Sequence, residues 1–101
     1  MAALGEMLEL GAAAGDLHRE VGRAAGRFGV KHLFAYGPHG ADTAAGAAEA
    51  GVPHAEALDD HDAIASAVFR AAAPGDALLV KGSRGVRMET VIEALKRLYG
   101  G

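Results

Sequence analysis

Cysteine is absent from this 101-residue sequence, and so is tryptophan. The lack of cysteine excludes a disulfide framework and any zinc site built from thiolates. The N-terminus carries no basic segment followed by an apolar core, and no stretch of the sequence is long and apolar enough to span a membrane. These absences predict a soluble, cytoplasmic domain that has no membrane partner.

An excess of positive charge is also missing. The 10 lysines and arginines are outnumbered by 13 aspartates and glutamates, so the net charge is −3 with neutral histidines. Nucleic-acid-binding domains usually gather a basic excess on one face, so this balance argues against nucleic acid as a partner. A chain of this length buries roughly 60–65% of its unfolded surface. We therefore expect residues 1–101 to form a single domain with one modest core.

Strand and helix signals alternate along the chain. Short apolar runs predict strands over residues 2–4, 32–36, 52–55 and 77–80. Apolar residues at helical spacing predict helices over residues 16–28, 41–50, 59–70 and 88–98. The last helix is the clearest, because its apolar residues form a stripe with i, i+3, i+4 and i+7 spacing: Met88, Val91, Ile92, Leu95 and Leu98.

This alternation predicts an α/β fold of the Rossmann-like class, with a mostly parallel sheet of about four strands and helices on both faces. Parallel strands need crossover connections, and such crossovers are right-handed. If the first three strands step outward and the strand at 78–80 crosses back beside the first, the strand order reverses between the first and fourth strands. Ligands bind at the carboxyl ends of strands at such a point. The loops expected there are 5–11, 37–40, 58–62 and 81–87.

One of these loops is unusually rich in charge. In the stretch LLVKGSRGVRMETVIEAL, Lys81, Gly82, Ser83 and Arg84 lie between an apolar run that predicts a buried strand and the last helix. Glycines allow a tight turn or a close approach to a ligand, and cations before a helix start favour an anion. A solvated connection explains the same residues when they are taken alone. The order Lys-Gly-Ser is not a P-loop, and the pattern G-x-x-x-x-G-K-[ST] occurs nowhere in the sequence.

Five histidines raise the question of a metal site. None of them shows the H-E-x-x-H or H-x-x-x-H spacing that places two rings on one helical face: His18, His32, His39, His54 and His61. We therefore predict no metal site. His18 lies near the start of a helix, a position more typical of a surface or capping histidine than of a catalytic base.

No set of catalytic residues is evident. Glu6 and Glu9 lie in one loop and could form a general-base pair, although loop acids are usually solvated. Ser66 lies inside a predicted helix, and Ser83 has no neighbouring base in the sequence. The residues alone predict an α/β domain with an anion-binding edge and no catalytic residue.

Four segments together extend this interpretation. They are LGEMLELG (4–11), LHREVG (17–22), PGDALLVKGSRGVRME (74–89) and VIEAL (91–95). In this order and spacing they resemble the C-terminal domain of the Mur ligases, most of all the MurF type, which adds D-alanyl-D-alanine to a UDP-N-acetylmuramoyl-tripeptide. The resemblance covers nearly the whole chain.

The resemblance implies a three-domain enzyme of peptidoglycan synthesis that forms an amide through an acyl phosphate. In such ligases an N-terminal domain holds the UDP-sugar, and a central ATPase domain carries the P-loop and the Mg²⁺ ligands. The C-terminal domain closes over both and presents the incoming amino component. ATP and Mg²⁺ would therefore belong to the full-length ligase, with no cofactor in this chain, and the central and N-terminal domains would be its missing partners.

The resemblance also implies roles for particular residues. Lys81, Gly82, Ser83 and Arg84 would hold D-alanyl-D-alanine, with its carboxylate as the anion, and Glu6 would flank the same cleft. The turn from Tyr36 to His39 would face the nucleotide. These positions are expectations carried over from the family.

The family domain normally begins upstream of the first strand, so the resemblance also implies an N-terminally truncated domain. We expect such a domain to be a substrate-binding half-site that is catalytically inert alone. Two alternatives remain open from the residues themselves. One is a free-standing Rossmann-like module that binds phosphate or a nucleotide at the Lys81 loop, and the other is an interaction domain without a small ligand.

Overall fold

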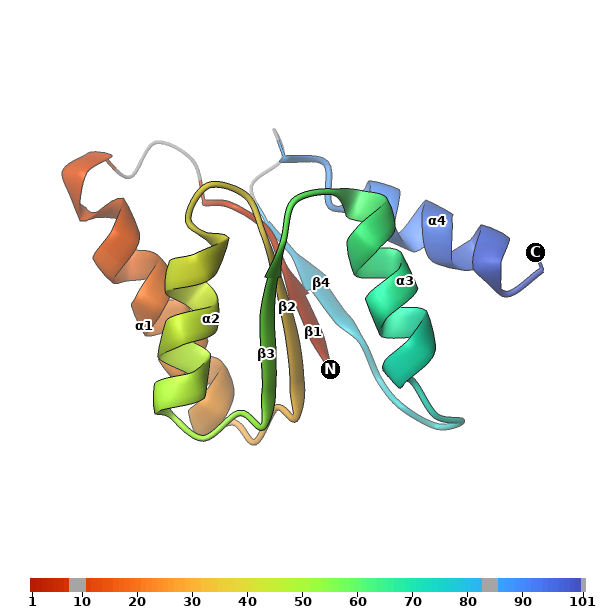
Figure 1. Cartoon of the computed structure of the whole chain (residues 1–101), viewed down its shortest axis with the longest axis horizontal. Coiled ribbons are helices and arrows are strands. Elements are labelled where there is room, and N and C mark those ends of the chain that lie inside the picture. The colour runs from red at the N-terminus through yellow and green to blue at the C-terminus, as the bar shows by residue number, and fades with distance from the viewer. Residues whose placement is uncertain (8–10, 83–85, 101) are drawn as a thin grey trace.

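The computed structural model describes residues 1–7, 11–82 and 86–100. Strands and helices alternate along this part of the chain (Figure 1). The elements are β1 (Ala2–Leu4), a 3-10 turn η1 (Gly11–Ala13), α1 (Ala14–Arg27), β2 (His32–Tyr36), α2 (Gly40–Glu49), β3 (His54–Leu58), α3 (His61–Ala71), β4 (Leu79–Lys81) and α4 (Glu89–Leu98). In the described part of the chain, no helix combines the length and the apolar character that crossing a membrane requires.

The strands form one four-stranded sheet in the order β3-β2-β1-β4. Each of its pairings is parallel: β1 with β2, β1 with β4, and β2 with β3. The predicted α/β class and the predicted return of the fourth strand to the first are therefore confirmed. β1 lies at the reversal point of the strand order, although it has only three residues.

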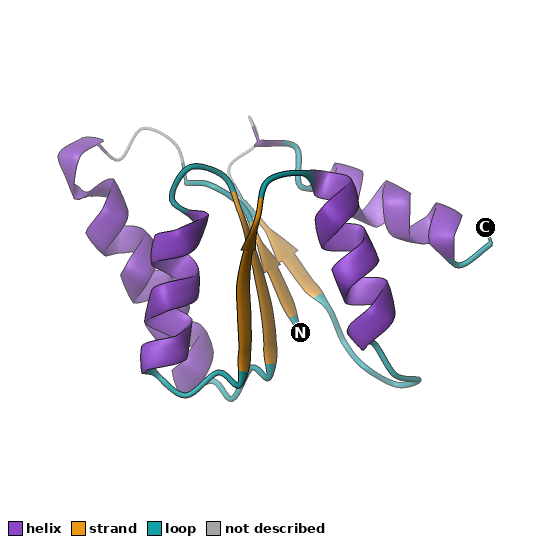
Figure 2. Ribbon diagram, viewed as in Figure 1, coloured by secondary structure: helices purple, strands orange, loops and turns teal. Residues whose placement is uncertain are grey.

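Helices cover both faces of the sheet, with α1 and α2 on one side and α3 and α4 on the other (Figures 1 and 2). Because successive side chains of a strand point to opposite faces of the sheet, β1 contributes side chains to the hydrophobic clusters on both faces. Ala2 and Leu4 face the layer under α1 and α2, together with Leu33 and Ala35 of β2. Ala3 faces the larger cluster, which draws most of its side chains from α3 and α4: Phe34, Ile64, Ala65, Ala67, Val68, Met88, Val91, Ala94 and Leu95.

Helices α1 and α2 pack with their backbones in close contact. A Cβ atom built on Gly22 of α1 would lie 1.9 Å from the carbonyl oxygen of Thr43, and one on Gly46 of α2 would lie 1.9 Å from that of Arg19. Only glycine permits such an approach. Arg19 also pairs with Glu49 across the helices at 2.7 Å, but both side chains are solvent-accessible, so the pair contributes little.

Two strand predictions need correction. The third strand runs from His54 to Leu58 rather than over 52–55, because its backbone pairs with β2 from His32↔His54 to Tyr36↔Leu58. The fourth strand runs from Leu79 to Lys81 rather than over 77–80. It was also expected to be buried, but β4 lies at the edge of the sheet and Leu79 is 57% exposed.

Candidate functional site

The strand ends gather at one edge of the sheet. Leu4 lies opposite Ala35 and Lys81 on its two neighbours, and Tyr36 lies opposite Leu58. Because the strands are parallel, the segments that follow them leave from the same edge (Figure 2). The edge where the parallel strands were expected to end together is therefore present in the fold, and it brings together side chains that are far apart in the sequence. Ligand binding at this edge stays a prediction.

A cleft of about 600 Å³ opens at this edge. Its walls carry charges of both signs and an aromatic pair: Glu6, Tyr36, Gly37, Pro38, Asp59, His61, Val86 and Arg87. The rings of Tyr36 and His61 are stacked with their centroids 4.2 Å apart. Nε2 of His61 donates a hydrogen bond to the carbonyl oxygen of Val86 at 2.7 Å, which fixes this ring against the segment before α4.

Arg87 adopts an unusual backbone conformation beside this cleft. Its φ angle is +52°, in the left-handed region that residues with a Cβ rarely occupy. Its carbonyl oxygen accepts a hydrogen bond from the amide of Thr90 at 3.0 Å, so the strained residue leads directly into α4. Such strain is concentrated at functional sites, and here it accompanies a cation on the cleft wall.

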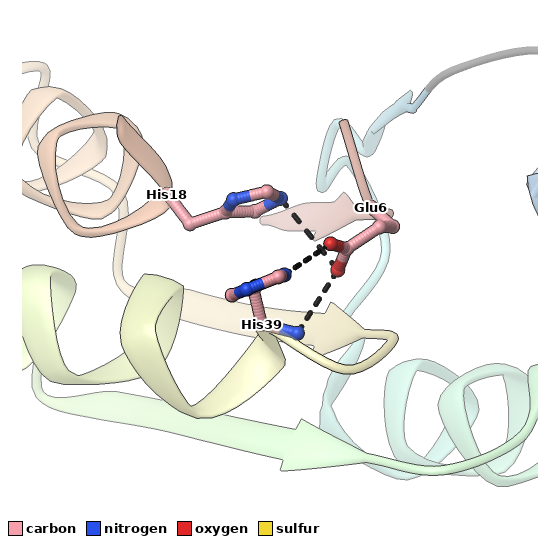
Figure 3. A group of neighbouring side chains, drawn as sticks. All are labelled: Glu6, His18 and His39. Carbon is pink, nitrogen blue, oxygen red and sulfur yellow. Dashed lines mark hydrogen bonds and ion pairs between the residues drawn. The ribbon is translucent and has the colours of Figure 1, made fainter. Parts of the chain in front are cut away.

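Glu6 lines the cleft, and its carboxylate also points toward two histidines, His18 and His39 (Figure 3). It is only 5% exposed, and Oε1 accepts a hydrogen bond from the backbone amide of His39 at 3.0 Å. Oε2 pairs with Nδ1 of the same histidine, while Nε2 of His18 lies 3.6 Å from Oε1. Gly37 makes room for this carboxylate, because a Cβ there would lie 2.8 Å from Oε1.

Opposing effects act on the pKa of Glu6. Burial raises it, whereas hydrogen bonds from the side chain and backbone of His39 lower it, as does the positive charge of His18 and His39 when protonated. The lowering effects prevail, so the pKa of Glu6 falls below its ordinary value of 4.5. The carboxylate is therefore ionised at neutral pH although it is buried.

His18 is buried rather than at the surface. It is 1% exposed, Nδ1 donates to the carbonyl oxygen of Ala14 at 2.6 Å, and Nε2 accepts from the amide of Met7 at 3.0 Å. The prediction of a surface or capping histidine is wrong, because His18 shares the inward face of α1 with Ala14 and Gly22. Their i, i+4, i+8 spacing was the signal in the sequence that could have indicated burial.

The expected Lys81 loop is only partly described. Lys81 and Gly82 line a second cavity of about 220 Å³, together with Leu4, Gly5, Met7, His18, Val21 and Thr43. Ser83 and Arg84, also expected to hold substrate, lie outside the described residues. Glu6 lines the larger cleft instead, so the single cleft expected for Glu6 and Lys81 is divided into two cavities.

The two residues expected on the nucleotide side also lie near Glu6. Tyr36 shares the larger cleft with it, and His39 binds it directly. The structure thus brings together residues that were expected on opposite sides of a site. Their roles in binding remain predictions.

Glu6, His18 and His39 also form a cluster of potential metal ligands. Their nearest nitrogen and oxygen atoms all lie within 4.8 Å of one another. The spacing rules for helical histidine pairs could not detect this cluster, because its members follow β1, lie within α1 and precede α2. The sequence-based prediction of no metal site therefore rested on local motifs alone.

Comparison with known proteins shows which family the chain belongs to. The model of the family described as "Mur ligase, glutamate ligase domain" matches residues 1–84. The UDP-N-acetylmuramoyl-tripeptide--D-alanyl-D-alanine ligase of Bacillus subtilis (strain 168) is 34% identical over 99 residues, which cover 94% of this chain and 21% of that protein. The chain thus spans about a fifth of the length of this relative.

Solved structures have the same fold. A crystal structure of MurF from Acinetobacter baumannii matches 95% of this chain and 22% of its own with a TM-score of 0.79 at 22% identity. MurF ligase from Thermotoga maritima in complex with ADP matches 95% of this chain and 21% of its own, with a TM-score of 0.71 at 27% identity. The chain therefore belongs to the Mur ligase family and corresponds to the C-terminal domain of its MurF type.

Proposed function

We propose that this chain is the substrate-binding C-terminal domain of a cytoplasmic ligase that adds D-alanyl-D-alanine to a UDP-N-acetylmuramoyl-tripeptide. Support comes from the family match and from the relative named for this reaction. ATP and Mg²⁺ would bind to the full-length ligase, which would also supply the ATPase and UDP-sugar domains. This chain alone would be inert, since its sequence contains no P-loop.

The cleft with both signs of charge is the observation that carries the proposal. A dipeptide at neutral pH has an ammonium group at one end and a carboxylate at the other. Glu6 and Asp59 would hold the ammonium group, and Arg87, which lines the same cleft, would hold the carboxylate. The loop residues Lys81 and Gly82, with Ser83 and Arg84, remain candidates for the carboxylate side on the basis of the resemblance.

Binding to the isolated domain should be weak. Asp59 and Arg87 are exposed, and solvated ion pairs contribute at most about 1 kcal/mol each before ordering costs. A few such contacts correspond to a dissociation constant of about 1 mM or weaker. The affinity of the full-length ligase would be higher, because its other domains would close over the dipeptide.

An amide chemical-shift titration tests the proposal. We expect D-alanyl-D-alanine to shift signals around the cleft, at Glu6, Tyr36 and Asp59. Two analogues separate the charges: N-acetyl-D-alanyl-D-alanine lacks the ammonium group, and D-alanyl-D-alaninamide lacks the carboxylate. Each should bind more weakly than the dipeptide, because each loses one ion pair.

Variants identify the residues responsible. Arg87→Asn removes the cation but places a residue that tolerates positive φ, so the fold is kept while dipeptide binding weakens. Lys81→Ala tests the family-derived site, and Lys96→Ala on the exposed side of α4 is the matched control. Binding that is insensitive to Arg87→Asn and Lys81→Ala would contradict the proposal. Stronger binding of ATP or phosphate than of dipeptide would favour a free-standing nucleotide module.

A further inference from the structure

The group formed by Glu6, His18 and His39 has a geometry suited to a metal ion (Figure 3). Three separate segments supply it: the turn after β1, the second turn of α1 and the residue before α2. We propose that these three side chains bind a divalent transition-metal ion of the zinc type. This inference does not depend on the proposed substrate.

The chemistry of the donors selects this class of metal. Two imidazole nitrogens and one carboxylate oxygen make up the three-residue set of many zinc sites, in which a fourth position holds water or a ligand. Imidazole suits zinc, cobalt, nickel and copper, whereas magnesium and calcium prefer oxygen donors only. Within residues 1–7, 11–82 and 86–100, no other group of at least three histidines and acids has such closely spaced donor atoms.

A hydrogen bond to the backbone orients the ring of His18 for metal binding through Nε2. Nδ1 donates to the carbonyl oxygen of Ala14, so in the neutral ring the lone pair lies on Nε2. Nε2 is the nitrogen on the side of Glu6. A metal-binding histidine usually donates its other N–H to a backbone carbonyl in this way, which fixes both ring orientation and tautomer.

The distances require only a small rearrangement. Zinc bonds of about 2.0–2.2 Å place neighbouring ligand atoms about 3.3–3.6 Å apart in a tetrahedron. Nε2 of His18 and Oε1 of Glu6 are already 3.6 Å apart. The ion would take the place of the proton between Nδ1 of His39 and Oε2 of Glu6, and His39 would carry its proton on Nε2 instead.

A hydrogen bond within the chain competes with the ion for His18, and the partly exposed side chain of His39 gives the ion access to the cluster. The amide of Met7 donates to Nε2 of His18 and would have to turn away. The side chain of His39 is 35% exposed, so an ion can reach the cluster from solvent without the core opening. Glu6 also lines the larger cleft, which provides a second approach.

Isothermal titration calorimetry of the chain without a histidine tag tests the site. We expect one Zn²⁺ per chain, one Co²⁺ with the visible absorption of a low-coordinate complex, and no comparable binding of Mg²⁺. Glu6→Gln and His39→Gln should each weaken Zn²⁺ binding by at least about tenfold, since even residues behind the ligands change affinity by that much. Imidazole nitrogen shifts should move for His18 and His39.

A second histidine pair provides a matched control. His32 and His54 are stacked with centroids 4.7 Å apart and 16° between their planes, much like His18 and His39 at 4.9 Å and 19°. The double variant His32→Gln/His54→Gln should retain full Zn²⁺ affinity. Loss of binding in this control, unchanged binding in Glu6→Gln and His39→Gln, or no Zn²⁺ binding by the wild type would each overturn the proposal. Amide spectra confirm that every variant is folded.

Discussion

Burial gives the Glu6 carboxylate a role that a solvated loop acid would not have. Its oxygens are within reach of the side chain and backbone of His39 and of Nε2 of His18, so it links the turn after β1 to α1 and α2. A carboxylate removed from water is stable only when hydrogen bonds or charges compensate. Because these contacts lower the pKa of Glu6 in the folded chain, they make the stability of the fold depend on pH.

We predict that Glu6 stabilises the fold above about pH 4.5 and loses this effect in acid. Its pKa in the folded chain lies below the ordinary value of 4.5, so the folded state binds its proton less readily than the unfolded state. The stabilisation is complete above the unfolded pKa and disappears as the pH falls through the lowered folded pKa. Glu6→Gln should lower the free energy of unfolding by about 1–2 kcal/mol at pH 7.

Urea unfolding of the wild type and of Glu6→Gln at several pH values measures this difference. The difference in unfolding free energy between the two proteins should narrow below about pH 4.5, where Glu6 is protonated first in the unfolded state and then, at lower pH, in the folded state. Glu93→Gln, on the exposed side of α4, is the control and should show a small difference at every pH. If the difference in unfolding free energy between the wild type and Glu6→Gln stays constant down to the pH of acid unfolding, the predicted effect of the Glu6 charge is wrong.

At the level of elements, the contact between α1 and α2 depends on glycine. The two helices are so close that a Cβ atom on Gly22 or on Gly46 would overlap a backbone oxygen of the other helix. This closeness carries His18 of α1 toward His39 before α2, whose rings stack at 4.9 Å. Helix packing therefore sets the geometry of the Glu6 cluster.

We predict that Gly22→Ala destabilises the chain by at least about 2 kcal/mol, since an added methyl group would force the helices apart. Gly15→Ala in the same helix is the matched control. A Cβ there would have Asp42 as its nearest neighbour, at 3.4 Å, and alanine favours helix by up to about 1 kcal/mol. Thermal unfolding should show a lower melting temperature for Gly22→Ala only. Equal stability of the two variants would show that α1 and α2 can separate at little cost.

At the level of the whole molecule, the strand order determines where a ligand can bind. With β1 between β2 and β4, the segments after all four strands leave from one edge, and the larger cleft opens there. The chain corresponds to about a fifth of the solved MurF structures. In the proposed ligase the opposite wall of the site would come from the other domains.

We predict that the purified chain hydrolyses no ATP and forms no amide bond. The sequence has no P-loop to hold the β- and γ-phosphates, so the proposed reaction lacks its phosphate-binding part. A phosphate-release assay with ATP, Mg²⁺ and D-alanyl-D-alanine should give the rate of the buffer. Turnover that remains after repurification and increases with the concentration of this chain would contradict the proposal that this chain is inert alone.

The sequence by itself was sufficient for the fold class and the family. The strand order was a hypothesis based on the general rules for parallel sheets, and the structure confirms it. Local periodicity and turn residues located α1, α2, α3 and α4 to within a few residues, and they located β1 and β2 at the observed bounds. These features could be read because they depend on neighbours in the chain. The motif segments then indicated the family, which the match over residues 1–84 confirms.

Only the tertiary structure decided which side chains meet. The bounds of β3 follow from its pairing with β2, and the exposure of Leu79 follows from the edge position of β4. The contact of Glu6 with His39 joins residues 33 positions apart, and no local spacing encodes such a distance. Long-range contacts arise from how helices pack on the sheet, so the buried cluster and the two separate cavities became visible only in the folded chain.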